Sequence, residues 1–208
     1  MTTPSATTWI AFAKHRRIAH GTPKEVAAEV KRLTDAQADT AVLIFDAESS
    51  QPVEIDLRGS LAAVLKRLPA EPPQDAAHAV VQTAPEASEP SRGPGRPRLG
   101  VVAREVTLLP RHWDWLGAQP GGASVALRKL VEHAQRASAA ADQRRAAIES
   151  AYRFMHAMAG DATGFEEASR ALFAGDSSRL QTEVAHWPRD VREHLLALAE
   201  RAMPAMSI

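Results

Sequence analysis

The chain has 208 residues, with 25 basic and 25 acidic side chains, so its formal net charge is zero. No overall charge draws it to nucleic acid or to an anionic membrane, and any electrostatic preference has to be local. Apolar residues make up 45% of the chain, which excludes a wholly disordered protein, and the absence of cysteine excludes disulfides, thiolate catalysis and cysteine-ligated metals. No apolar run reaches the roughly 18 residues of a membrane span, and the first residues lack the pattern of a secretion signal. We therefore expect a cytoplasmic protein that does not enter a membrane.

Charge and proline divide the chain into folded parts and a linker. The net charge is +1 over residues 1–68, −4 over 69–91, +4 over 92–112 and −1 over 113–208. Seven of the fourteen prolines lie between Pro69 and Pro97, and proline removes backbone donors and restricts the residue before it. We predict four segments: an α+β domain (1–68), a disordered proline-rich linker with a basic arm (69–99), a strand-helix-helix element (100–137) and a helical region (138–208).

The first segment begins with a predicted hairpin. Two short strand-like runs cover residues 9–14 and 16–19. Thr22, Pro23 and Glu25 then supply an N-cap, a proline at the first helical position and an acid in the first turn. A helix is therefore expected after the hairpin.

Two further strands and a second helix are expected next. The apolar run 41–46 predicts a buried strand, and Val53, Ile55 and Leu57 alternate with acidic residues, as in a half-exposed strand. A helix is expected over 60–68. The resulting order ββαββα predicts a small α+β domain with helices on one face of a mainly antiparallel sheet.

The rest of the chain is predicted to be mostly helical. Segments are expected over residues 111–119, 123–158, 164–174, 178–186 and 189–203. Gly160, Gly175 and Pro188 supply breaks between the later helices. An all-α bundle is therefore expected over 138–208.

The element at 100–137 has the order short strand, short helix, glycine turn, longer helix. Leu109, Trp113 and Leu116 lie on one face of the short helix, and the longer helix carries an apolar stripe made by Leu127, Leu130, Val131 and Ala134. An element of about 35 residues with a free strand edge cannot close a core alone. The simplest partner is the same element of a second chain, so a homodimer is expected.

This stretch resembles the ribbon-helix-helix family of bacterial DNA-binding proteins, in which two such strands pair into a ribbon that enters the major groove. The resemblance implies that Gly122, Ala123 and Ser124 open the second helix, where free amides and the helix dipole hold a DNA phosphate. Leu127-Arg128 matches the apolar-arginine pair that the family often places one turn in. The alternative is an ordinary helical hairpin preceded by a strand.

The strand departs from the family pattern. One strand phase turns Ala103, Glu105 and Thr107 outward, and the opposite phase turns out Arg104, Val106 and Leu108. A carboxylate aimed at the groove is unfavourable unless it accepts from a cytosine amino group. Both phases stay open, and with them the identity of the base-reading residues.

A basic arm stands just before this element. Its Gly95-Arg96-Pro97 resembles the core of an AT-hook, an extended segment that lies in the narrow minor groove of A·T-rich DNA. The usual arginine before the glycine is replaced by Pro94, and Arg92 and Arg98 are the substitutes. The resemblance implies double-stranded, A·T-rich DNA as the partner, and the alternative is a basic solvated linker.

The whole chain is also similar to a bacterial family known as domain of unknown function 2239. The matching stretches are 43–46, 53–59, 95–98, 113–116 and 170–176. This resemblance covers nearly all of the chain and implies no established activity.

Signals for catalysis are weak. The eight histidines include no i, i+4 pair and no HExxH, and there is no Walker loop, GxGxxG or GxSxG. Asp46, Glu48, Glu54 and Asp56 could form a cation-binding patch on the N-terminal sheet, although outward carboxylates on a sheet are usually solvated. We expect no catalytic residue, no metal and no cofactor.

The sequence thus predicts a non-enzymatic, dimeric DNA-binding protein, either a transcriptional regulator or a nucleoid-associated protein. Its candidate DNA-binding residues are Arg92, Gly95, Arg96, Pro97, Arg98, Arg104, Glu105, Thr107, Gly122, Ala123, Ser124 and Arg128. One alternative is a protein-interaction or antitoxin-like dimerisation scaffold without DNA readout. The other is an enzyme that uses the acidic face of the N-terminal sheet.

Overall fold

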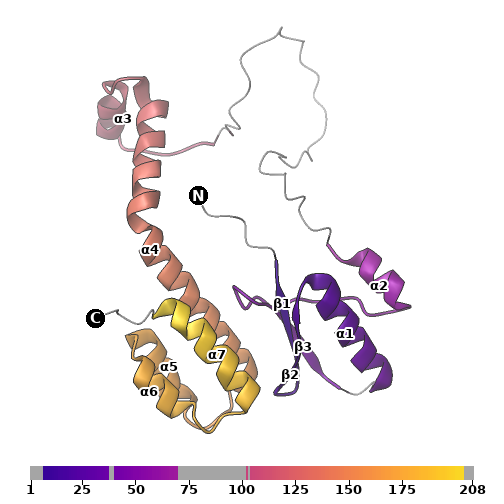
Figure 1. Cartoon of the computed structure of the whole chain (residues 1–208). Coiled ribbons are helices and arrows are strands. Elements are labelled where there is room, and N and C mark those ends of the chain that lie inside the picture. Colours follow the sequence, from indigo (N-terminus) through magenta and orange to yellow (C-terminus); the bar gives the residue numbers. More distant parts are fainter. Residues whose placement is uncertain (1–6, 38–39, 70–101, 103, 204–208) are drawn as a thin grey trace. The chain divides into compact units, whose positions relative to one another are not determined.

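The computed structural model describes residues 7–37, 40–69, 102 and 104–203. Its contacts define two units: Met1–Pro69 together with Ala134–Ile208, and Ala70–His133. Figure 1 shows the elements in chain order. The architecture is α+β, with an antiparallel sheet and its helices near the N-terminus and a largely helical C-terminal part, as the sequence predicts at this level. The predicted linker, apart from Pro69, and the basic arm lie outside the described residues.

The sheet has three antiparallel strands in the order β2-β1-β3. They are β1 (Trp9–Ala13), β2 (Arg16–Gly21) and β3 (Val42–Asp46), so the predicted hairpin and the predicted strand at 41–46 are confirmed. The central strand β1 is buried on both faces, which explains its unbroken apolar run. Trp9 and Ala11 belong to one core, while Ile10 and Phe12 belong to the other.

Helix α1 (Pro23–Ala36) packs on the face of Trp9 and Ala11 through Val26 and Val30. Its start is a capping box, because the Glu25 amide donates to the Thr22 hydroxyl at 3.4 Å and the Thr22 amide donates to the Glu25 carboxylate at 2.9 Å. The hydrogen bonds from Thr22 also lower the pKa of Glu25. The helix start predicted from the sequence is confirmed.

The second predicted helix is α2 (Leu61–Arg67), which begins at the N-cap Ser60. The predicted strand through Val53, Ile55 and Leu57 is wrong, because only a single bridge from Phe45 to Pro52 joins this segment to β3. The observed order is therefore ββαβα.

The side chains of this segment nevertheless alternate as the sequence predicts. Val53, Ile55 and Leu57 pack against the core under α1, and the residues between them are exposed. Asp56 accepts from the backbone and the guanidinium of Arg58, and this local hydrogen bonding competes with a strand ladder. Burial of the side chains on one side therefore keeps residues 53–57 extended, although no ladder of backbone hydrogen bonds joins them to β3.

The helical part agrees closely with the sequence prediction. It consists of α3 (Pro110–Gly117), α4 (Gly122–Ala159), α5 (Phe165–Ala174), α6 (Ser177–Glu183) and α7 (Arg189–Ala202). Helix α4 has 38 residues because the chain has no glycine or proline between residues 123 and 159 and is rich in alanine there. The predicted boundary at residue 137 falls inside this helix.

The sheet and the C-terminal helices share one core. Ile10, Phe12 and Phe45 pack with side chains from α4, α5, α6 and α7. At its centre the Phe154 ring lies 5.3 Å from the Phe12 ring and 5.6 Å from the Phe45 ring, measured between centroids. The two ends of the chain thus form a single packed body, although the sequence patterns present them as separate parts.

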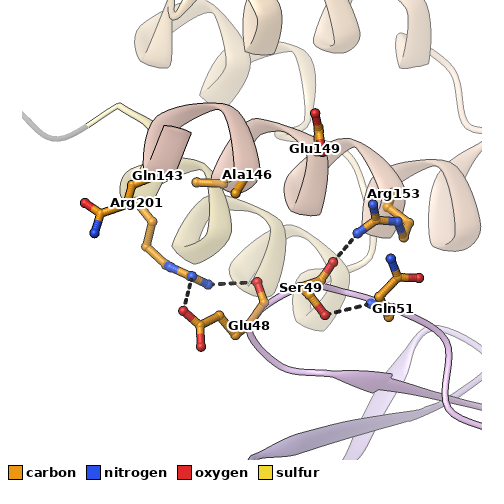
Figure 2. A pocket seen from close by; sticks show the side chains of 9 residues that line it. Glu48, Ser49, Gln51, Gln143, Ala146, Glu149, Arg153 and Arg201 are labelled. Carbon is orange, nitrogen blue, oxygen red and sulfur yellow. Dashed lines mark hydrogen bonds and ion pairs between the residues drawn. The ribbon is translucent and has the colours of Figure 1, made fainter. Parts of the chain in front are cut away.

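The turn that follows β3 is hydrogen-bonded to helices α4 and α7. Ser50 is fully buried with φ +53°, and its hydroxyl lies 2.9 Å from that of Ser150 on α4. Ser150 donates its one proton to the Glu48 carbonyl at 2.8 Å, so Ser50 is the donor in the pair of hydroxyls. Arg153 donates to the Ser49 carbonyl and Arg201 donates to the Glu48 carbonyl, as Figure 2 shows.

Replacing Ser150 by alanine should lower the free energy of unfolding by about 1–3 kcal/mol, because the buried Ser50 hydroxyl then has no acceptor. Ser138→Ala on the same helix is the matched control, since the Ser138 hydroxyl only bonds back to the Ala134 carbonyl. Its effect should stay within about 0.5 kcal/mol. Urea unfolding of both variants measures the difference, and equal losses would show that the turn is not fastened through Ser150.

Candidate nucleic-acid interface

The candidate interface is the helical hairpin formed by α3, a glycine turn and the first turns of α4 (Figure 1). Pro110 occupies the first turn of α3, where its missing amide costs nothing. Gly121 and Gly122 have φ values of +87° and +75°, a region that side-chain-bearing residues rarely adopt. A Cβ on Gly121 would also lie 3.2 Å from the Val125 side chain. The glycine pair therefore fixes where α4 begins.

This hairpin buries very little apolar surface. Among the described residues between 102 and 133, only Leu116 and Ala126 are buried apolar side chains. Trp113 and Trp115 are 41% and 52% exposed, and exposed aliphatic side chains accompany them: Val106, Leu109, Leu130 and Val131. Of the apolar faces predicted from the sequence, Leu116 is buried and Leu127 is half-buried, while the other large side chains lie open to solvent. Such a surface is typical of an unoccupied interface.

The short strand that the sequence predicts before α3 would cover residues 104–109, and it is not formed in the described structure. These residues have no regular secondary structure, because a strand is defined by pairing and none of the described residues pairs with them. Val106 is exposed and Leu108 is half-buried, so the two do not form one buried face. Arg104, Glu105 and Thr107 are all exposed.

The start of α4 brings together the other predicted contact residues. Gly122, Ala123 and Ser124 form its first turn, and the Gly122 amide donates to the Gln119 carbonyl at 2.9 Å. One turn later Arg128 is exposed, and its Nε donates to the Ser124 carbonyl at 3.1 Å. Helix N-termini with an adjacent guanidinium are favourable places for a phosphate.

The arm residues Arg92, Gly95, Arg96, Pro97 and Arg98 lie outside the described residues. Two exposed cations near the hairpin were not among the predicted contacts. Arg111 stands in the first turn of α3 and Lys129 directly follows Arg128. Their basic character and their place in the two predicted helices were the available signal.

Three of the four acidic residues considered for an enzyme make hydrogen bonds or ion pairs within the structure, and the fourth, Glu54, is exposed. Asp46 accepts from the amide and the hydroxyl of Ser49 at 2.8 and 2.7 Å. Glu48 pairs with Arg201 at 3.1 Å. The Arg58 guanidinium and amide hold the pKa of Asp56 well below its usual range, and Arg67 adds to the effect. No group of three or more metal-ligating side chains occurs among the described residues.

A cavity of about 470 Å³ lies beside the fastened turn, between it and the helices α4 and α7 (Figure 2). Its charged residues are Glu48, Glu149, Arg153 and Arg201, two of each sign. Both guanidiniums already donate to backbone carbonyls of the turn. The arrangement is suited to holding the turn in place, so we regard these residues as structural.

Within the described part of the chain, none of the helices combines the length and the apolar character needed to cross a bilayer. A family model described as "Uncharacterized protein conserved in bacteria (DUF2239)" matches residues 8–199. None of the curated proteins and none of the solved structures gives a match.

Proposed function

The chain belongs to the bacterial DUF2239 family, whose description carries no activity, and from the chain's own residues we propose that it is a dimeric DNA-binding protein. Two copies of the α3–α4 hairpin form the dimer, and the paired segments 104–109 form a ribbon-helix-helix-like reader of the major groove. The protein acts as a transcriptional regulator or a nucleoid-associated protein.

One observation carries this proposal: the hairpin exposes two tryptophans while burying only Leu116 and Ala126 among its described residues. At about 25 cal/mol per Å² of apolar surface, leaving this face in water is costly. When two copies of this hairpin pair about a two-fold axis, each copy covers the exposed apolar surface of the other. The pairing also gives residues 104–109 a strand partner, which none of the described residues of the single chain provides.

The cations of the hairpin favour DNA as the ligand of this dimer. Arg104, Arg111, Arg128 and Lys129 stand on or beside the two helices, and their exposed charges are available to phosphates. The α4 N-termini of the two chains, one from each, add backbone amides. The preceding arm, with Arg92, Arg96 and Arg98, adds an A·T-preferring contact in the minor groove. Phosphate neutralisation then supplies most of the affinity, which makes binding strongly salt dependent.

A dimerisation scaffold without DNA readout is the second candidate, and Glu105 favours it. This exposed carboxylate lies in the segment that would enter the groove, where it repels phosphates and accepts only from a cytosine amino group. Both candidates predict a dimer in light scattering. Titration with duplex DNA separates them.

Arg128→Ala should weaken binding to an A·T-rich duplex by about tenfold or more, because a charge-assisted hydrogen bond to phosphate is lost from each copy. Arg145→Ala is the matched control: it removes the same charge from the same helix at a position paired with Asp142 at 3.1 Å, outside the hairpin. A mobility-shift titration at low salt compares the two variants. If both variants bind DNA equally well, the α4 N-terminus is not part of the DNA interface.

A further inference from the structure

The tip of the β1–β2 hairpin borders a cavity of about 450 Å³. It lies against the last turn of α1 and the segment before β3, and its lining residues are Ala13, Lys14, His15, Arg16, Leu33, Gln37 and Thr40. This volume is within the range of small-molecule sites, roughly 300–1,000 Å³. The hairpin belongs to the unit that contains the sheet, whereas the proposed DNA-binding hairpin belongs to the other unit.

Three adjacent basic or imidazole side chains line this cavity, and no described carboxylate pairs with them. Lys14, His15 and Arg16 are exposed, and none of them takes part in the ion pairs of the described residues. The nearby Asp35 pairs with Lys31 instead. Asp39 lies outside the described residues. The cations at the hairpin tip are thus available to an anion.

The backbone at the tip places the Lys14 side chain at a conformationally costly position of the turn. Lys14 has φ +53°, in the left-handed region that glycine and asparagine occupy most easily. A side-chain-bearing residue there costs about 1–2 kcal/mol. A two-residue hairpin loop needs a positive φ at its first residue, and here a lysine, not a glycine, occupies that position. Costs of this kind concentrate at functional sites.

We propose that this cavity binds the phosphate group of a small phosphate monoester. A monoester carries close to two negative charges at neutral pH, which the Lys14 ammonium and the Arg16 guanidinium can balance. Guanidinium matches phosphate geometry in a bidentate manner, and ammonium adds a point charge. His15 and Gln37 offer further N–H donors, while Leu33 and Ala13 provide an apolar wall for the organic part of the ligand.

Calorimetric titration of the full chain with adenosine 5′-monophosphate tests the proposal, with adenosine as the probe that lacks the phosphate. The wild-type chain should bind the monophosphate at least tenfold more tightly than adenosine. The double variant Lys14→Gly with Arg16→Thr should lose this difference. Because glycine relieves the strained turn and threonine suits a strand, thermal unfolding of the variant should show that the fold is kept.

A control variant with Lys24→Gln and Arg170→Gln removes the same charge from exposed positions on other elements, and it should bind like the wild type. The proposal would be overturned if the wild type bound monophosphate and adenosine equally well. Unchanged binding of the monophosphate by the Lys14→Gly, Arg16→Thr variant would also overturn it. It would also be overturned if only duplex DNA, and not the monophosphate, binds in a manner that needs Lys14 and Arg16. Arg128→Ala belongs to the other unit and should leave monophosphate binding unchanged, so failure here is distinguishable from failure of the DNA proposal.

Discussion

Replacing Phe154 by alanine should lower the free energy of unfolding by about 3–5 kcal/mol, the usual cost of truncating a buried phenylalanine. Phe154 is fully buried where the two ends of the chain meet. Its ring contacts Phe12 of β1, Phe45 of β3 and His194 of α7. Truncation therefore leaves a cavity bordered by both the sheet and the helices. We expect the variant to lose strand and helix signals together, at one lower urea midpoint.

Phe173→Ala is the control for this prediction. Phe173 makes an aromatic contact with Tyr152 but is 58% exposed, so its loss should cost about 1 kcal/mol or less. Circular dichroism and tryptophan fluorescence follow the helices and the core in the same urea titration, since Trp9 and Trp187 lie in the described cores. Two separate transitions, of which only the helical one shifts in Phe154→Ala, would show that the two ends of the chain fold independently.

Acid should destabilise the fold through His194, by about 3 kcal/mol once the pH is well below 4. Burial between Phe12 and Phe154, together with the charges of His20, Arg17 and Arg201, lowers the pKa of His194 from 6.5 to about 4. Its Nε2 is buried without a hydrogen-bond partner in the described structure. The neutral ring is therefore the form that the folded core accepts.

The sign of this effect follows from the two pKa values. Between pH 6.5 and 4 the unfolded chain binds a proton on His194 that the folded chain does not bind, so the free energy of unfolding falls as the pH falls. Above pH 6.5 the residue adds no pH dependence. Glu25 and Asp56, whose pKa values are also lowered, add their own losses only below their ordinary values of 4.5 and 3.8. The window from pH 6.5 to 4.5 is thus the one in which His194 is best isolated.

His194→Leu tests this prediction, because leucine fills the space without a titratable group. Urea unfolding between pH 7.5 and 4.5 should give a nearly flat stability profile for this variant and a declining one for the wild type. An alanine at the exposed His112 serves as the control and should follow the wild-type slope. Parallel profiles for wild type and His194→Leu would show that His194 titrates in the folded core as it does in water.

Local sequence signals predicted most of the elements because those signals act through neighbouring residues. The Thr22–Glu25 capping box and the N-cap Ser60 satisfy the first amides of α1 and α2. Gly175 closes α5 with φ +73°. A cap or a turn glycine works in the same way in any fold, so reading it needs no tertiary information.

Two features could not be predicted from local signals: the absence of a strand at 53–57 and the core that the two ends of the chain share. Both depend on residues that are far apart in the sequence. Val53, Ile55 and Leu57 alternate because one side packs on the core, and the same alternation arises with or without a neighbouring strand. The contact of Phe12 with Phe154 joins residues 142 positions apart (154 minus 12), and no local pattern identifies such a pair. Phe154 could be assigned to a helix core from sequence, but not to the core of the sheet.

The candidate interface was predicted in its helices and its glycine turn, and these are present. Its predicted strand has no pairing partner among the described residues, and in the proposed dimer that partner is the second chain. The sequence did not predict a site at Lys14-His15-Arg16, because Lys14 and Arg16 lie at the ends of the two predicted strands and match no binding motif. Only the cavity that these residues line, and the left-handed Lys14 backbone, draw attention to them.

Equilibrium titration of the full-length chain with an A·T-rich and a G·C-rich duplex, at several salt concentrations and with the mass of the complex measured by light scattering, tests the central claim most directly. We predict a complex of two chains per duplex and tighter binding to the A·T-rich duplex. The logarithm of the binding constant should fall linearly with the logarithm of salt, by about 0.9 per phosphate neutralised. A monomeric chain that binds neither duplex at about 50 mM salt, where such contacts are strong, would contradict the account.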